Sequence, residues 1–470
     1  MFAPDSVAVI GATNIPGTWG FGIMRHLLDS VNRNSYPVNP TVSEVLGIAT
    51  YNSVLDIPSP IDLAVIVVPA AQVPKILQEC VQKIVGAAAI ISAGFAETGE
   101  QGCELENKLV RIAQQGGLHF IGPNSMGYVD TSSHLSTMAW IKELKPGAVA
   151  VISQSGNYGE QIVYSGLTLG IGFSKFISSG NETDLHLEDY LEYLVQDEST
   201  EIIAAYIEGL REGRRFLQLA RKTTVRKPMI VIKSGGTEGA ARAARSHTGA
   251  LAGSDEVYSG AFKQAGVIRV KDEGELCDVA TALLNQPLPR GNRVGVLTIG
   301  GGLGVVAVEA CEKAGLEIAP LTSSTVEKLN SYLPSRWSHA NPVDVAGMGG
   351  AKRELVYSSL WALMEDDNMD AILFQTPIIL GTDRIAAIVG INDKEALAYQ
   401  ATQKERLNMV RQRARECGKP VFLVTAVADA EAYSFLQGEG IPIYTSPYRA
   451  ARVLQHLYWY DKYLNNSTVK

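Results

Sequence analysis

Short apolar runs rich in β-branched residues recur along the first 130 residues, and each is followed by a loop and then by an amphipathic pattern. Such runs lie at residues 6–13, 62–69 and 87–92. After the first run, apolar residues repeat at the spacing of one helix face, at Ile23, Met24, Leu27, Leu28 and Val31. This alternation predicts an α/β domain with a parallel sheet and ligands at the carboxyl ends of its strands.

The same pattern restarts twice after connections that contain glycine and proline. Lys145-Pro146-Gly147 precedes an apolar run at 148–152, and residues 286–291 precede another at 293–299. A chain of 470 residues is also too long for one core. We therefore predict a Rossmann-like domain at 1–130, followed by two flavodoxin-like domains with doubly wound parallel sheets at 148–287 and 291–465.

A turn suited to anion binding follows the run at 148–152. It consists of Ser153, Gln154, Ser155 and Gly156, and apolar residues at 162, 163 and 167 indicate a helix that begins near Asn157. The first N–H groups of a helix have no partner within the helix, so we expect them to bind an anion together with the serine hydroxyls. A simple strand-to-helix turn is the alternative.

The first strand and its turn do not favour NAD. The glycine spacing Gly11-x5-Gly17-x2-Gly20 differs from G-x-G-x-x-G, and the next strand runs into Val38, Asn39 and Pro40 with no acidic residue to bind a ribose. A nicotinamide dehydrogenase is therefore a weak candidate.

One histidine stands in a loop of small residues, Ser246-His247-Thr248-Gly249-Ala250. A neutral imidazole can act as a nucleophile and accept a phosphoryl group when its other nitrogen is held by an acceptor. Glu208, which follows the apolar run at 202–207, is the candidate acceptor. From these residues alone, a histidine without a role and a solvated glutamate remain open alternatives.

Composition narrows the class of protein. Hydrophobic residues make up 46% and charged residues 19%, and no apolar run has the length of a membrane span. The net charge of -8 argues against nucleic-acid and membrane-surface partners. The five scattered cysteines show neither metal-ligand spacing nor a disulfide framework, and the first residues lack a signal-peptide pattern. We expect a cytoplasmic protein without a metal site of its own.

The segment Ser246-His247-Thr248-Gly249-Ala250-Leu251-Ala252-Gly253 resembles the phosphohistidine loop of the nucleoside-diphosphate-forming acyl-CoA synthetases, the group that contains succinyl-CoA synthetase and ADP-forming acetate–CoA ligase. The Ser-Gln-Ser-Gly turn is similar to the family segment that holds the phosphohistidine and the reacting carboxyl group. The resemblance implies that Ser153, Ser155, Gly156 and Asn157 bind phosphate or the acyl group, and that His247 and Glu208 are catalytic.

The ends of the first-domain strands are similar to the CoA-binding domain of that family. The resemblance implies CoA contacts at Gly11, Thr13, Gly17, Val38, Asn39, Pro40, Val68, Pro69, Ser92, Ala93, Gly94, Phe95, Asn124 and Ser125. Two positions depart from the family pattern. Thr41 stands where relatives often have lysine, and Ser125 stands where many have cysteine.

The family relationship also implies a reaction and a partner. The chain resembles the α subunit of an enzyme that interconverts acyl-CoA, phosphate and ADP with free acid, CoA and ATP. No Walker A pattern is present and three domains use up the chain, so Mg²⁺ and ADP or ATP are expected on a separate ATP-grasp β subunit, in an α2β2 heterotetramer. The alternative is a non-enzymatic CoA or acyl-CoA sensor with the same fold. Asn157, Tyr158 and Glu160 replace the small residues common in the family, so acetate is not assumed to be the acid.

Overall fold

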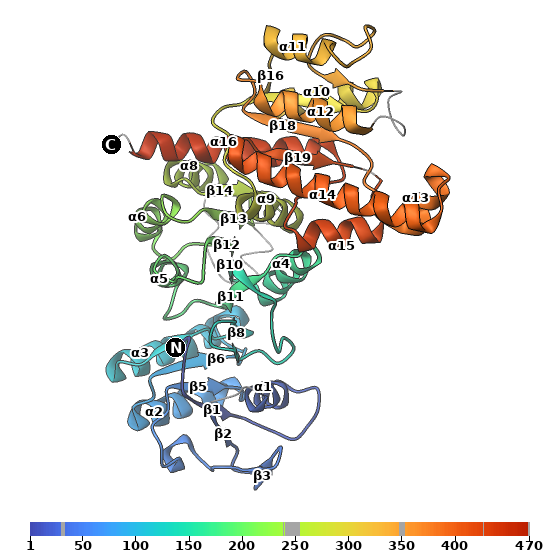
Figure 1. Cartoon of the computed structure of the whole chain (residues 1–470). Helices are drawn as coiled ribbons and strands as arrows, with labels where there is room; N and C mark the ends of the chain where they lie inside the picture. The colour runs from blue at the N-terminus through green and yellow to red at the C-terminus, as the bar shows by residue number, and fades with distance from the viewer. Residues whose placement is uncertain (30–32, 238, 240–253, 347–352, 426, 469–470) are drawn as a thin grey trace. The chain divides into compact units, whose positions relative to one another are not determined.

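The computed structural model describes every residue except 30–32, 238, 240–253, 347–352, 426 and 469–470 (Figure 1). The chain forms two compact units, Met1–Leu276 and Cys277–Lys470. Two large sheets lie in the first unit and a third lies in the second. The predicted α/β class with parallel sheets is confirmed.

The first sheet is parallel throughout, with strand order β2-β1-β5-β6-β7. Side chains alternate between its faces. Val7 and Val9 belong to the buried cluster that includes α1 (Trp19–Leu28), whereas Ala8 and Ile10 cluster with α2 (Val73–Lys83) and α3 (Glu100–Gly116). The helices therefore cover both faces, which explains why these strands are continuously apolar. The strands are β1 (Ser6–Ile10), β2 (Asn34–Val38), β5 (Leu63–Ile66), β6 (Ala87–Ile90) and β7 (His119–Ile121).

The second sheet has strand order β14-β13-β12-β10-β11-β8-β9. The strands from β14 to β11 are parallel and follow the doubly wound order of flavodoxin-like sheets, as predicted. They are β10 (Pro146–Ser153), β11 (Phe173–Ser178), β12 (Ile202–Ile207), β13 (Met229–Lys233) and β14 (Ile268–Val270). The connecting helices are α4 (Gly156–Thr168), α5 (Leu187–Leu194), α6 (Gly213–Thr224) and α8 (Asp255–Ala265), and α9 (Glu273–Asn285) follows β14.

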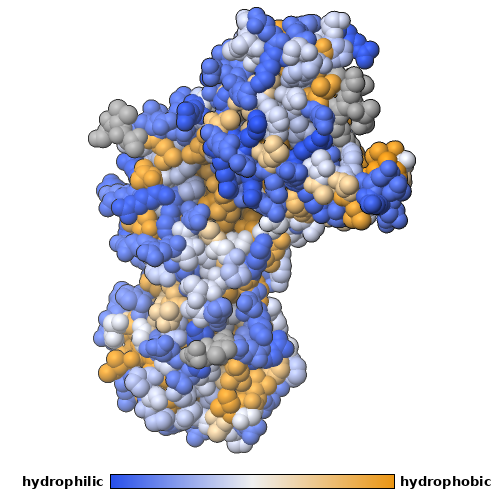
Figure 2. Space-filling view, in the orientation of Figure 1, coloured by the Kyte–Doolittle hydropathy of each residue, from blue (hydrophilic) through white to orange (hydrophobic). Residues whose placement is uncertain are grey.

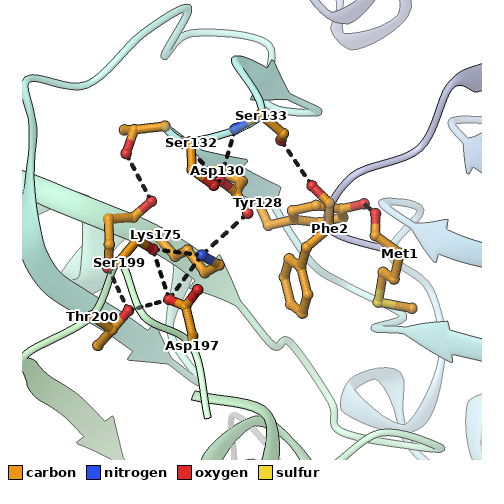
Figure 3. A network of polar contacts seen from close by, with 12 residues as sticks. Met1, Phe2, Tyr128, Asp130, Ser132, Ser133, Lys175, Asp197, Ser199 and Thr200 are labelled. Carbon is orange, nitrogen blue, oxygen red and sulfur yellow. Dashed lines mark hydrogen bonds and ion pairs between the residues drawn. The ribbon is translucent and has the colours of Figure 1, made fainter. Parts of the chain in front are cut away.

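Two antiparallel strands, β8 (Gly127–Asp130) and β9 (Leu135–Ser136), extend this sheet, although residues 127–130 lie in the predicted first domain. Lys175 of β11 lies opposite Asp130, and its Nζ is 3.2 Å from Asp130 Oδ2 and 2.9 Å from Asp197 Oδ2 (Figure 3). The Lys175 side chain is only 1% exposed. A buried ammonium group needs opposite charges, so these contacts fasten β8 to the second sheet.

The sheet of the second unit is parallel, with strand order β16-β15-β18-β19-β20 and with β17 also paired to β15. This order confirms the third flavodoxin-like fold. The strands are β15 (Arg293–Thr298), β16 (Glu317–Ile318), β17 (Val343–Asp344), β18 (Ala371–Gln375), β19 (Val421–Val424) and β20 (Ile443–Tyr444). The helices are α10 (Gly301–Lys313), α11 (Ser323–Asn330), α12 (Arg353–Glu365), α13 (Thr382–Val389), α14 (Asp393–Cys417), α15 (Ala430–Gly438) and α16 (Pro447–Thr468).

The long helix α14 is rich in charged residues. It begins at a capping box, in which Asn392 Oδ1 accepts from Glu395 N and Glu395 Oε2 accepts from Asn392 N, both at 3.0 Å. Apolar side chains gather on the surface where α13 meets α14 (Figure 2), and Ile388 and Leu397 are exposed there. Among the described residues, no helix has the length and apolar character needed to span a membrane.

Candidate active site

The carboxyl ends of the first sheet bring the predicted CoA contacts to one edge. The chain order reverses between β1 and β5, which opens a crevice outside these strand ends. Gly11 follows β1 with φ +97°, and a Cβ at this position would lie 2.1 Å from Val67 O. This position therefore requires glycine. The last residue of β2 and the loops at this edge carry the predicted contacts, Gly11, Thr13, Gly17, Val38, Asn39, Pro40, Val68, Pro69, Ser92, Ala93, Gly94, Phe95, Asn124 and Ser125.

Several of these side chains hold the loops of the edge together. Asn39 Nδ2 donates to Ala12 O at 2.8 Å, and its Oδ1 accepts from Thr41 N at 2.8 Å. Ser92 Oγ donates to Val68 O at 2.5 Å and accepts from Val68 N at 3.1 Å. The Phe95 side chain is fully buried in the core. These side chains therefore fix the backbone of the loops in which the CoA contacts are predicted.

Ser125 has a similar supporting role. Its hydroxyl is buried, donates to Ser178 O at 2.6 Å and accepts from Gly127 N at 2.8 Å. It therefore links the first sheet's edge to β11.

A single cavity of about 510 Å³ runs from this edge to the turn after β10. It therefore unites residues that the sequence assigned separately to CoA and to phosphate. Nine predicted residues line it, namely Val68, Pro69, Ser92, Ala93, Asn124, Ser125, Ser155, Gly156 and Asn157. The other predicted residues, Gly11, Thr13, Gly17, Val38, Asn39, Pro40, Gly94, Phe95, Ser153 and Glu208, do not line this cavity.

The turn after β10 caps α4. Ser155 is the N-cap, and its Oγ accepts from Tyr158 N at 3.4 Å. The Ser153 hydroxyl is fully buried and donates to Ser155 O at 2.5 Å, so it shapes the turn. A Cβ on Gly156 would lie 2.4 Å from Met126 Sδ. The cavity therefore meets the amino end of a 13-residue helix, where backbone N–H groups favour an anion.

Glu208 follows β12, which lies beside β10 in the second sheet. The chain order reverses between these two strands, so the turn after β10 and Glu208 both lie at a switch point. Glu208 N donates to Gln154 Oε1 at 2.5 Å, and Lys233 Nζ donates to Glu208 O at 3.0 Å. This is the position at which doubly wound sheets commonly bind ligands.

The groups around Glu208 have shifted acid–base properties. Burial, opposed by a hydrogen bond to Ser234 and reinforced by the Glu208 carboxylate, raises the pKa of Tyr206. Burial and the charge of Arg269 lower the pKa of Lys233, against the opposite effects of Asp255 and Glu208. Perturbed titratable groups clustered at a switch point are typical of a functional site. His247 lies outside the described residues, so its pairing with Glu208 stays a prediction.

The structure adds residues that sequence reasoning did not single out. Trp19, Met126 and Gln154 line the same cavity. Gln154 stands inside the Ser-Gln-Ser-Gly motif, and that placement could have signalled its role. Met126 directly follows the predicted Ser125, whereas Trp19 lies outside every motif and no pattern in the sequence brings it to the cavity.

Two protein-family models match the chain. A model described as a CoA binding domain matches residues 5–131, and a model described as a succinyl-CoA ligase like flavodoxin domain matches residues 146–283. These two matches fall on the two sheets that the cavity joins.

Full-length relatives are also found. The chain is 40% identical to the acetate–CoA ligase [ADP-forming] II subunit alpha of Pyrococcus furiosus, over 95% of this chain and 94% of that one. It is 40% identical to the acetate–CoA ligase [ADP-forming] of Methanocaldococcus jannaschii, over 98% of this chain but 64% of that one. A solved Ca. Korarchaeum cryptofilum acetyl-coenzyme A synthetase 1, in complex with phosphate and ADP, is 34% identical with a TM-score of 0.84, over 99% of this chain and 98% of that one.

Proposed function

The chain belongs to the family of ADP-forming acyl-CoA synthetases, whose α subunits it matches along nearly its whole length, and we propose that it binds CoA and carries the phosphoryl group in such an enzyme. The observation that carries this proposal is the shared cavity. One end is formed by strand ends of the CoA-binding fold and the other by the amino end of α4. An acyl-CoA thioester at the first end would meet phosphate at the second.

The proposed reaction has three steps. A phosphate oxygen attacks the thioester carbonyl, the C–S bond breaks, and CoA leaves as its thiol to give an acyl phosphate. His247 then attacks phosphorus, the P–O bond to the acyl group breaks, and the acid leaves as its carboxylate. Finally ADP takes the phosphoryl group from His247 to give ATP. The amino end of α4 would stabilise the phosphate charge, and Glu208 would orient the imidazole.

We assign the nucleotide step to a partner. The P. furiosus relatives named as alpha subunits are matched over 94% and 97% of their length, whereas the M. jannaschii relative has over a third of its chain unmatched. In the described residues, no group of three or more His, Cys, Asp or Glu side chains could hold a metal ion. The proposed partner is an ATP-grasp β subunit that supplies Mg²⁺ and ADP or ATP in a cytoplasmic α2β2 enzyme.

Calorimetry on the purified chain tests the ligand assignment. We expect CoA to bind and NADH to give no binding signal, because the strand-end loops lack the ribose-binding acid of NAD proteins. ATP-dependent ligase activity should appear only when a β partner is added. Tight binding of NADH without binding of CoA would contradict the proposal.

A further inference from the structure

The turn between β11 and α5, residues 178–184, contacts the cavity-lining residues Asn124 and Gln154 and has an unusual backbone. Gly180 has φ +64° and Glu182 has φ +51°. Left-handed backbone is uncommon for a glutamate, and it persists only where surrounding contacts hold it. Glu182 is also buried, with 2% of its surface exposed. A buried acid in a strained conformation points to a specific role for its carboxylate.

The Glu182 carboxylate accepts two hydrogen bonds. Ser179 Oγ donates to Oε1 and Gln154 Nε2 donates to Oε2, both at 2.8 Å. Ser179 Oγ also lies 3.3 Å from Ser153 O. Glu182 therefore contacts the cavity-lining turn after β10 through one side chain, that of Gln154.

Gln154 in turn holds the strand end that carries Glu208. Its Oε1 accepts from Glu208 N at 2.5 Å and from Gly209 N at 3.0 Å, while its Nε2 donates to Gly209 O at 2.8 Å. The amide group thus uses both of its ends on the backbone at 208–209, and Glu182 accepts its remaining N–H. A continuous set of hydrogen bonds runs from Glu182 through Gln154 to Glu208.

The neighbouring Asn181 points the other way, toward the first sheet. Its Nδ2 donates to Glu97 Oε2 at 2.7 Å and to Glu106 Oε2 at 2.9 Å, and its Oδ1 accepts from Asn124 Nδ2 at 3.2 Å. Asn181 therefore contacts the cavity-lining Asn124 after the first sheet, whereas Glu182 contacts the cavity-lining Gln154 after β10. Substitutions at Glu182 and at Asn181 should have separable effects.

We propose that Glu182 is a positioning residue for phosphoryl transfer, which acts through Gln154 to hold the Glu208 strand end in place. The inference rests on the proposed function, because it concerns the step in which His247 takes the phosphoryl group. The Glu182 carboxylate accepts from Gln154 and Ser179, so in this proposal it acts through Gln154. Its effect should therefore appear in the rate of phosphorylation and not in the affinity for CoA.

The surroundings of Glu182 place the titration of its carboxyl group within an experimentally accessible pH range. Burial, reinforced by the charge of Glu188 and opposed by the hydrogen bonds from Ser179 and Gln154, raises the pKa of Glu182 to about 7. Arg211, from the loop after β12, has the opposite effect. Tyr190 of α5 also lies near the Glu182 carboxylate. Burial raises the pKa of Tyr190, and the charges of Glu182, Asp189 and Asp184 raise it further.

Two substitutions separate geometry from charge. In Glu182→Met both acceptors are lost at similar volume, so Gln154 loses a partner. In Glu182→Gln the side-chain oxygen can still accept from Gln154, and the new N–H₂ can donate to Ser179 Oγ while that hydroxyl turns to Ser153 O. Glu188→Gln is the matched control, because Glu188 is an equally buried acid that does not contact Gln154 and accepts from Glu212 N at 3.2 Å.

The measurement is single-turnover phosphorylation of the full chain by ³²P-labelled acetyl phosphate, between pH 6 and pH 8. Glu182→Met should phosphorylate about tenfold more slowly, the cost of losing one hydrogen bond to a charged group. The ratio of the wild-type rate to the Glu182→Gln rate should rise about threefold as the pH increases from 6 to 8, with a midpoint near pH 7. The ionised acid makes stronger hydrogen bonds than the amide. Glu188→Gln should retain the wild-type rate at pH 8.

CoA affinity decides between positioning and a general structural role. The dissociation constant for CoA should stay within about twofold of the wild-type value in each Glu182 variant, well below a tenfold change. A Glu182→Met rate equal to wild type, a pH-independent ratio for Glu182→Gln, or a parallel loss of CoA affinity would overturn the inference. If Glu182→Met does not fold, the pH dependence of Glu182→Gln decides alone. Absence of label on the wild type would instead reject the proposed function.

Discussion

At the scale of single residues, Glu208 is the side chain on which the proposed chemistry most depends. It follows β12 at the switch point, and its backbone is fixed by Gln154 and Lys233. Its carboxylate forms a side-chain hydrogen bond with Tyr206 and is the group that we propose for acid–base work. A change confined to that carboxylate therefore tests the role without removing the backbone contacts.

Replacing Glu208 by Gln should slow phosphorylation of His247 by about 100-fold, the lower range for loss of an acid–base contribution. The amide has the same shape but does not stabilise the positive charge that develops on the imidazole. The rate can be measured by rapid quench with acyl phosphate, with circular dichroism and CoA affinity as controls. Wild-type rates in this variant would remove Glu208 from the mechanism.

Sequence reasoning at this scale recognised motifs but not the direction of side chains. Ser155 and Gly156 were predicted beside an anion and do line the cavity. Ser153 stands in the same motif, yet its hydroxyl is buried and bonded to Ser155 O. Glu182 was not assigned a role, because a left-handed glutamate in a Gly-Asn-Glu turn has the same sequence signature as an ordinary solvated turn. Rotamers and backbone angles of this kind depend on tertiary contacts.

At the scale of elements, apolar patterning gave the buried parallel strands most accurately. The run at 202–207 coincides with β12, and the helix expected near Asn157 begins at Gly156. The antiparallel strands β8 and β9 were not predicted, because β8 joins the second sheet through β11, where Lys175 and Asp130 form a buried ion pair, and β9 pairs only with β8. A contact between residues so far apart in sequence leaves no local periodicity.

Two glycines with nearly equal backbone angles test how closely the turn at 178–184 approaches the first sheet. Gly180 has φ +64° and Gly117 has φ +63°. A Cβ at Gly180 would lie 2.3 Å from Pro123 O, whereas at Gly117 it would meet nothing within 4 Å. The two positions share the same conformational penalty and differ in the steric clash.

Gly117→Ala should lower the free energy of unfolding by about 1 kcal/mol, the usual cost of a left-handed alanine. Gly180→Ala should cost clearly more and should also weaken CoA binding, because the clash displaces the backbone at 123–124. Urea denaturation and calorimetry measure the two effects. Equal stability of the two variants would show that the close approach is absent.

At the scale of the whole molecule, the order of motifs carried more information than any one motif. Separate similarities at the first strand ends, the Ser-Gln-Ser-Gly turn and the His247 loop pointed to one family, and relatives that match along almost the full chain confirm it. The sequence did not show that the strand ends of the first sheet and the amino end of α4 line one cavity. This depends on how the two sheets of Met1–Leu276 pack.

The central claim is that the chain carries a phosphoryl group on His247, and the site of labelling tests it most directly. The chain, incubated with ³²P-labelled acyl phosphate or with labelled ATP and its partner, should acquire a label that is acid-labile and stable in base, as expected of a phosphoramidate. His247→Ala should abolish the label and ligase turnover while CoA still binds with wild-type affinity, since the predicted CoA contacts lie at the edge of another sheet. Label on another residue, or label that persists in His247→Ala, would contradict the account.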